Sequence, residues 1–277
     1  ARIILPATVA AWRFGPDSKS VLTVDRQGQV VQWKGADFQE QTSLMDLGTK
    51  LSPDLYSVLI SREGQWVTAG SADGTIKVWN LQERTLLRQA TVSTGRVIPL
   101  EFTEKETKLV FLCGNDGSFH EWDLTTEQET QYWQGPTRSS AAAFSLDERL
   151  CVMVGDDGTT LLRDMVTGDE TKQTLKKMGL PDVTAFSPDG RLFATAHSGG
   201  YATLWETATF RELARWLLRT AHSVAFSPDG NRLAVSIGGS EAVLLWDVES
   251  HQELLTLGGE GSLFGASAFS ADGNIYG

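Results

Sequence analysis

The side chains that could carry chemistry in this chain of 277 residues are four histidines, two cysteines and several aspartates next to glycine. The histidines are His120, His197, His222 and His251. We expect His120 and His222 on strands and His197 in a turn. None stands at a spacing from cysteine, aspartate or another histidine that typically binds a metal ion. The sequence therefore predicts no metal site.

The aspartates lie in short segments that also contain glycine. They are Asp25, Asp73, Asp116, Asp156 and Asp157. Calcium is one interpretation, but Asp-Gly is in itself favourable turn chemistry, and that simpler interpretation is favoured. The sequence has neither a Gly-x-Ser-x-Gly nucleophile elbow nor a Walker-type phosphate loop. We therefore predict no catalytic residue and no cofactor.

The strands and turns that position these residues can be predicted from a sequence pattern that occurs twice, at 183–206 and at 222–247. Each stretch has a strand ending in Phe186 or Phe226, the turn Ser-Pro-Asp-Gly, a second strand, a glycine-bearing turn and a third strand ending in Trp. Proline fixes φ at the second turn position, and glycine adopts conformations that other residues avoid. The pattern predicts a meander of short antiparallel strands.

The tryptophans that end the third strands recur at a nearly constant spacing. They are Trp33, Trp79, Trp122, Trp205 and Trp246, with Arg163 in the place between Trp122 and Trp205. By subtraction, their steps are 46, 43, 41, 42 and 41 residues. We call this regular series a ladder. The residues that end the first strands form a second ladder with the same period, which consists of Phe14, Ile60, Phe102, Phe144, Phe186, Phe226 and Phe269. A period of roughly 40–45 residues with four strands is typical of a propeller blade.

The repeat resembles that of the WD-repeat β-propeller family over essentially the whole chain. The resemblance rests on Asp-Gly-Thr-Ile-Lys-Val-Trp-Asn at 73–80, Asp-Gly-Ser-Phe-His-Glu-Trp-Asp at 116–123 and Leu-Trp-Asp at 245–247. The family often has Gly-His before the first strand, which this sequence lacks. The family has a Ser or Thr at one position of the second strand. In this sequence Thr23 and Thr195 occupy it in two repeats, whereas three other repeats have Ala69, Leu112 or Met153 there. We therefore expect the family's buried Asp-His-Ser-Trp network to be absent, and packing to stabilise the blades instead.

The resemblance and the ladders predict an all-β, seven-bladed propeller of four-stranded antiparallel blades, as one domain covering residues 1–277. The strand at 2–5 would close the seventh blade beside 265–269 and 274–277, because a ring must hide its sheet edges. The third strand of that blade, with its tryptophan, is missing at the C-terminus. The chain begins with Ala1 rather than Met, so we expect a piece of a longer protein.

The charge balance limits the classes of partner. Lys and Arg number 24 and Asp and Glu 35, which gives a net charge of −11. Such a surface argues against nucleic acid and anionic membranes. No stretch reaches the ~18 consecutive apolar residues of a membrane span. Cys113 and Cys151 occupy different places in their repeats, so we expect two free, half-buried thiols, which favours the reducing cytoplasm.

The remaining feature is the surface that the loops present, since recognition often lies on loops held by a rigid scaffold. The resemblance implies docking on the side of the fourth-to-first and second-to-third connections. The former carry Lys50, Arg96, Arg138, Lys176, Lys177 and Arg219. These recurring cations predict a channel mouth that binds an acidic segment of a protein or peptide partner. The alternative is that loops carry charges without any such role.

Three classes of function stay open. A non-catalytic scaffold for protein interaction is the first choice. The Ala-Phe-Ser-Pro-Asp-Gly style resembles bacterial members of the family, which often follow kinase, protease or other signalling domains. The second is therefore a regulatory or sensing module attached to an upstream catalytic domain. The third is a propeller enzyme, which would need acids, histidines or a metal converging at the channel.

Overall fold

The computed structural model describes residues 9–35, 38–48, 55–135, 139–155, 158–174, 181–197, 199–237, 242–258 and 268–274. Over these ranges the chain forms strands, turns and loops, and they contain no helix that is long and apolar enough to cross a bilayer. The strands build six four-stranded antiparallel sheets, which we call blades one to six in chain order. The blades divide between two compact units, and each unit is described by itself.

The first unit holds blades one to three and the turn at Ser270. Blade one consists of β1 (Val9–Phe14), β2 (Val21–Asp25), β3 (Gln29–Lys34) and β4 (Glu40–Asp46). Blade two consists of β5 (Leu55–Ile60), β6 (Trp66–Ser71), β7 (Thr75–Asn80) and β8 (Thr85–Thr91). Blade three consists of β9 (Val97–Thr103), β10 (Lys108–Cys113), β11 (Ser118–Asp123) and β12 (Glu129–Gln134).

The second unit holds blades four to six. Blade four consists of β13 (Ser139–Phe144), β14 (Leu150–Gly155), β15 (Thr159–Asp164) and β16 (Glu170–Thr174). Blade five consists of β17 (Pro181–Phe186), β18 (Leu192–His197), β19 (Tyr201–Glu206) and β20 (Glu212–Leu217). Blade six consists of β21 (Ala221–Phe226), β22 (Arg232–Ile237), β23 (Ala242–Asp247) and β24 (Glu253–Gly258).

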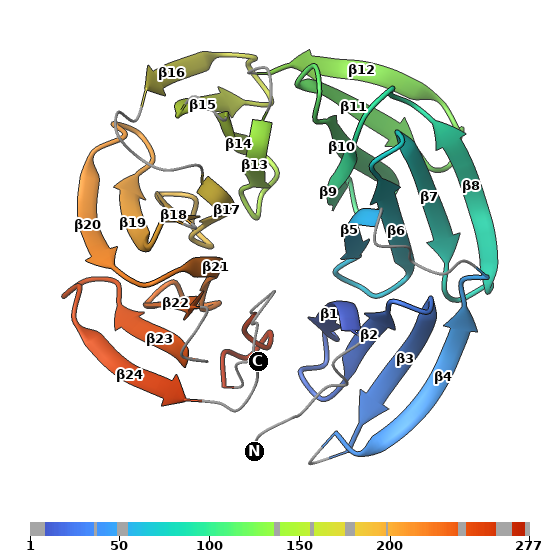
Figure 1. The fold of residues 1–277 in the computed structure, drawn as a ribbon, viewed down its shortest axis with the longest axis horizontal. Helices are drawn as coiled ribbons and strands as arrows, with labels where there is room; N and C mark the ends of the chain where they lie inside the picture. Colours follow the sequence, from blue (N-terminus) through green and yellow to red (C-terminus); the bar gives the residue numbers. More distant parts are fainter. Residues whose placement is uncertain are drawn as a thin grey trace. The chain divides into compact units, whose positions relative to one another are not determined.

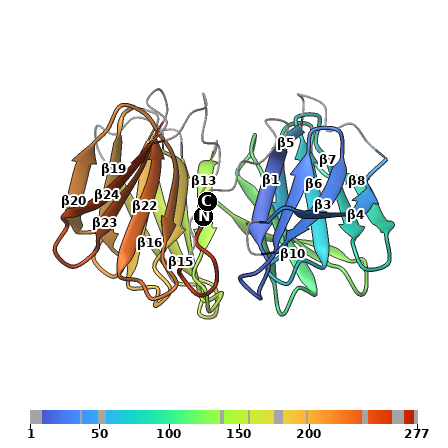
Figure 2. The ribbon, with the colours of Figure 1, turned by 90° about the horizontal axis from the view of Figure 1, so that it is seen from below.

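Every blade is a meander whose strands pair in chain order (Figure 1). In the first unit β1 lies beside β5 and β5 beside β9, and in the second unit β17 lies between β13 and β21. The blades of each unit therefore fan out from their first strands, which is the arrangement of β-propeller blades. The antiparallel course of the strands is visible from the side in Figure 2. The prediction of an all-β propeller with four-stranded antiparallel blades is confirmed.

The number of blades differs from the seven predicted, because the described residues form six. A blade needs several paired strands. The described residues 268–274 supply only a single bridge residue, Phe269, followed by a turn. The amide of Asp272 in this turn donates to Ser18 Oγ of blade one at 3.0 Å. The predicted strand at 2–5 lies outside the described residues, and the extent of the domain over 1–277 stays a prediction.

The Ser-Pro-Asp-Gly turns are held by their own side chains. In blade five Ser187 Oγ donates to Asp189 Oδ1 at 2.7 Å and accepts from the amide of Leu192 at 3.0 Å. In blade six Ser227 Oγ makes the matching bonds to Asp229 at 2.5 Å and from Arg232 at 2.9 Å. Both serines are buried. The turn sequence thus satisfies polar groups that the fold covers.

Replacing Ser227 with alanine is expected to lower the free energy of unfolding by about 1–2 kcal/mol at neutral pH, since the part-buried amide of Arg232 loses its partner. The Ser227 hydroxyl is the main group that lowers the pKa of Asp229. A carboxyl with a depressed pKa stabilises the fold above about pH 4 and loses this contribution as the pH falls through its folded value. The difference between wild type and variant should therefore shrink below about pH 4. Urea unfolding at several pH values measures this difference in the free energy of unfolding. A difference that does not change with pH would contradict the role of the Ser227–Asp229 hydrogen bond.

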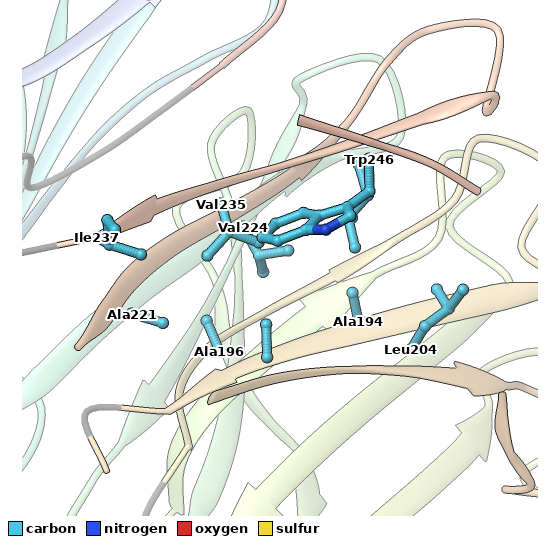
Figure 3. Packing of buried hydrophobic residues seen from close by; sticks show 10 residues of the cluster. Ala194, Ala196, Leu204, Ala221, Val224, Val235, Ile237 and Trp246 are labelled. Carbon is cyan, nitrogen blue, oxygen red and sulfur yellow. The ribbon is translucent and has the colours of Figure 1, made fainter. Parts of the chain in front are cut away.

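The ladder tryptophans pack between neighbouring blades. Trp79, Trp122, Trp205 and Trp246 are at most 4% exposed and Trp33 is 9% exposed. Trp246 of blade six packs in one cluster with Ala194 and Leu204 of blade five (Figure 3). Trp79 joins a cluster with Val24 of blade one. The rings of Trp246 and Trp79 therefore cover the preceding blade.

Tryptophan hydrogen bonding differs from the expectation of packing alone. Trp33 Nε1 donates to Thr23 Oγ1 at 2.8 Å, and Trp205 Nε1 donates to Thr195 Oγ1 at 3.1 Å. His197 Nε2 lies 3.0 Å from the same Thr195 oxygen, and its ring is stacked on Tyr201. Both threonines that the family position retains are therefore used. Blade five therefore contains a His-Thr-Trp chain that packing alone does not explain, whereas the expected absence of the family's Asp-His-Ser-Trp network stays a prediction.

Both cysteines are free thiols, as predicted, but they are fully buried rather than half-buried. Cys113 lies on β10 and Cys151 on β14, and each is a second strand paired on both sides. Such strands are covered by two neighbouring strands and by adjacent blades. Burial raises the pKa of both thiols.

Candidate functional site

The two connections on which docking was predicted meet at one edge of a blade. The residue that follows the fourth strand donates its amide to the glycine carbonyl of the second-to-third turn in three blades. These bonds join Leu47 to Gly28 at 2.9 Å, Val92 to Gly74 at 2.9 Å and Leu218 to Gly200 at 2.7 Å. We call this edge, formed by the second-to-third turn and the connection after the fourth strand, the loop edge of a blade. Backbone bonds thus fix the two connections to each other.

The connection 92–96 joins the loop edges of blades two and three. A Cβ on Gly74, at φ +89°, would lie 1.8 Å from the carbonyl oxygen of Ser93. A Cβ on Gly95 would lie 1.8 Å from the side-chain nitrogen Nδ2 of Asn115, in the turn of blade three. At Gly74 the approaching atom is backbone, so only glycine permits the contact there, and only glycine adopts this φ without strain. The connection is therefore held against both neighbouring turns.

Two of the six predicted docking cations lie within the described residues. Arg96 ends the connection before β9, and its side chain lies across Gly114 at the end of β10. Arg219 follows β20 and is exposed. These two belong to different units, each of which is described by itself. The other four, Lys50, Arg138, Lys176 and Lys177, lie outside the described residues, and the shared channel mouth stays a prediction.

The aspartates of the second-to-third turns bind their own turns. Asp25 Oδ1 accepts from the amides of Gln27 and Gln29, and Asp73 Oδ1 accepts from the amide of Thr75. Burial alone would raise the pKa of Asp116, but hydrogen bonds from the Ser118 hydroxyl and amide lower it. This supports the turn interpretation over calcium. The described part of the chain holds no group of three or more His, Cys, Asp or Glu residues suited to a metal, and Asp156 and Asp157 lie outside it.

A polar chain at the loop edge of blade three was missed from the sequence. Ser118 Oγ donates to Asp116 Oδ1 at 2.7 Å and lies 3.0 Å from His120 Nε2, while His120 Nδ1 lies 2.9 Å from Glu129 Oε1. Ser118 and His120 are two residues apart on β11, so they share one face of the sheet. Glu129 joins them from β12. The alternation Asp116, Ser118, His120 was the available signal.

The opposite edge of the first unit carries a second charged cluster. Arg13 Nη1 donates to the carbonyl of Ile60 at 2.9 Å, and Arg62 pairs with Glu101 at 3.1 Å. Glu106 accepts from the amide of Glu63 at 2.7 Å through Oε1, whereas its buried Oε2 has no partner. Glu106 has φ +64°, in a turn where glycine stands in blades two, five and six. These contacts tie the first-to-second turns of neighbouring blades together.

Comparison with known proteins identifies one repeat and several distant relatives. Residues 45–80 match the family model described as WD domain, G-beta repeat. Target of rapamycin complex subunit LST8 of Mus musculus is 24% identical over 181 residues, which cover 62% of this chain and 56% of that protein. The serine-threonine kinase receptor-associated protein of Gallus gallus is 24% identical over 144 residues, which cover 52% and 40%. The chain thus spans about half the length of these relatives.

A longer match extends the similarity along the chain. The guanine nucleotide-binding protein subunit beta of Nicotiana tabacum is 23% identical over 266 residues, which cover 88% of this chain and 70% of that protein. These relatives come from animals and a plant, so the prediction of a bacterial type of repeat receives no support. Residues 45–80 are a WD40 repeat, and every described blade has the same four-stranded order as the blade that contains most of it.

Proposed function

We propose that this chain is a non-catalytic platform that docks a protein or peptide partner on the loop edges of its blades. The observation that carries the proposal is the connection 92–96, which two neighbouring turns fix in place and which ends in Arg96. A rigid, polar loop edge can bind without rearranging, and this lowers the entropic cost of association. The names of the relatives agree with such a role, since they describe a complex subunit, a receptor-associated protein and a subunit beta.

The partner segment that we propose is acidic. Arg96 and Arg219 occupy equivalent connections in two blades, and Lys50, Arg138, Lys176 and Lys177 have the same place in the sequence repeat. On a chain with net charge −11, cations that recur in this way form local positive regions. A local field of this kind accelerates encounter and selects acidic ligands more than it adds affinity. Exposed charges are screened beyond about 10 Å at 0.1 M salt.

The test reverses two of these cations. With a fluorescent glutamate-rich peptide as the probe, Arg96→Glu with Arg138→Glu is expected to slow association at low salt by about tenfold or more, since steering contributes about 10–10³-fold. Stopped-flow anisotropy measures the rate. A matched control, Lys19→Glu with Arg191→Glu, changes the net charge equally but alters exposed cations in first-to-second turns. Equal slowing in both variants, or association with no salt dependence, would reject the site.

A further inference from the structure

The fourth strand of every blade has an open edge. The strands β4, β8, β12, β16, β20 and β24 each pair with a single neighbouring strand among the described residues (Figure 1). A strand at the edge of a sheet directs unpaired N–H and C=O groups outwards, and these can pair with a strand of another chain. Natural proteins prevent such pairing with charged side chains, lysine above all, and with β-bulges. The six outer strands differ in how far they use these devices.

Charged side chains protect four of the outer strands. Arg88 lies in the middle of β8, Lys172 in the middle of β16 and Arg215 within β20. β4 begins with Glu40 and ends with Asp46. If two copies of any one of these strands paired antiparallel, like charges would come close together, which is destabilising.

β24 lacks this protection. It reads Glu-Leu-Leu-Thr-Leu-Gly, and its one charged residue, Glu253, stands at the first position. The carboxylate of Glu253 accepts a hydrogen bond from the hydroxyl of Thr256. Leu254 and Leu255 are 52% and 48% exposed. The outer strand of blade six therefore combines exposed apolar side chains with an uncharged course.

The remaining outer strand, β12, differs from β24 in what its side chains contact. It also has its one charge, Glu129, at the first position. However, its Trp133 is buried, and Gln134 Nε2 donates to the carbonyl of Asp116 at 2.7 Å. Exposed leucines like those of β24 are not found among the side chains of β12 that the structure describes.

A β-bulge does not set β24 apart from the other outer strands. Its bulge lies at Leu254, between the pairs Leu245–Leu255 and Trp246–Glu253. The strands β4, β8, β12 and β20 have a bulge as well. After the bulge, 255–258 pair regularly with 242–245 of β23. This part of β24 is a regular strand edge.

We propose that β24 pairs antiparallel, edge to edge, with β24 of a second copy of this chain. Such a pair has two-fold symmetry, so each copy contributes the same residues. Antiparallel self-pairing places Glu253 of each copy at the uncharged end of the other strand, and no like charges meet. The backbone groups of the two edges supply the hydrogen bonds. Leu254 and Leu255 of one copy pack beside the same leucines of the other, because cross-strand neighbours on one face are in contact.

The size and the charge of the two copies define the kind of association. A pair of six-residue strands buries less surface than the ~1,200 Å² of a stable interface, so the dimer forms weakly and reversibly. The net charge of −11 on each copy opposes association. Salt screens this repulsion beyond about 10 Å at 0.1 M. Self-association therefore strengthens as salt rises, whereas docking of an acidic peptide weakens.

The test is sedimentation velocity of the full chain between about 1 μM and 1 mM, the range in which exposed strand edges associate. A monomer–dimer equilibrium that shifts towards dimer with added salt is expected. Thr256→Lys should weaken the dimer by about tenfold or more, because it places a cation on both edges. A matched control, Thr171→Lys on the exposed strand β16, adds the same charge to another blade and should leave the equilibrium unchanged. Circular dichroism verifies that both variants are folded.

Amide hydrogen exchange locates the contact. The amides of 255–258 that point away from β23 should exchange about tenfold more slowly in the dimer than in the monomer, while those of β16 should not change. A chain that stays monomeric at the highest concentration in high salt would overturn the proposal. Dimerisation of Thr256→Lys with wild-type affinity, or a dimer that protects another strand and leaves β24 unprotected, would also overturn it.

Discussion

Replacing Trp205 with alanine is expected to lower the free energy of unfolding by about 3–5 kcal/mol, the range for deleting a large buried aromatic ring. Trp205 is 4% exposed and stacks on Phe193, with centroids 6.0 Å apart. It shares a cluster with Val152 of the preceding blade. The deletion would open a cavity between two blades and leave the Thr195 hydroxyl without its indole donor. Urea unfolding followed by circular dichroism measures the loss.

A matched control lies on the same blade. Leu217 on β20 is 86% exposed, so Leu217→Ala is expected to change stability by no more than about 0.5 kcal/mol. Thr195→Val should fall between the two, because it keeps the packing but removes the hydroxyl that serves Trp205 and His197. If Trp205→Ala unfolds like wild type, the tryptophans do not stabilise the contact between blades.

The second large effect is expected from Gly74→Ala, which should lower the free energy of unfolding by about 2–6 kcal/mol. The added Cβ would lie 1.8 Å from the backbone oxygen of Ser93, at a φ of +89°. Left-handed backbone at a non-glycine residue and overpacking each cost about 1–3 kcal/mol. Ser93 cannot move without displacing the connection that ends in Arg96. The variant should therefore also weaken binding of the acidic peptide probe.

Gly48→Ala separates the two causes. Gly48 has φ +63° but nothing within 4 Å of an added Cβ. Only backbone strain remains there, so we expect a cost of about 1–2 kcal/mol. Thermal unfolding of both variants under the same conditions gives the comparison. Equal losses at Gly48 and Gly74 would show that the contact between turn and connection adds nothing.

The strands could be predicted well from the sequence, because short local patterns that define strand ends recur in the blades. The Ser-Pro-Asp-Gly turns and the strand-ending tryptophans depend on residues a few positions apart. In the described blades the first and third strands accordingly end at the predicted ladder residues or one residue beyond them. The blade count depended instead on pairing between distant ends of the chain, which no local pattern specifies.

The site was less predictable, because register and side-chain orientation decide it. In blade three Leu109 pairs with Trp122, which places Phe111 rather than the predicted Leu112 at the position equivalent to Thr195. A shift of one residue exchanges the two faces of a strand. His197 was predicted in a turn, whereas β18 extends to include it. The polar chain of blade three required a register shift in β12 that the sequence does not reveal.

The packing of each tryptophan on the preceding blade has a consequence for synthesis on the ribosome. Blade two exposes one face until Trp122 of blade three arrives, 43 residues after Trp79 by subtraction. At about 5–20 residues per second, this delay lasts about 2–9 seconds. During that time a nearly complete blade presents Ile76 and Val78 to the solvent. A newly made blade therefore avoids aggregation only if the next blade is synthesised and packs on it quickly.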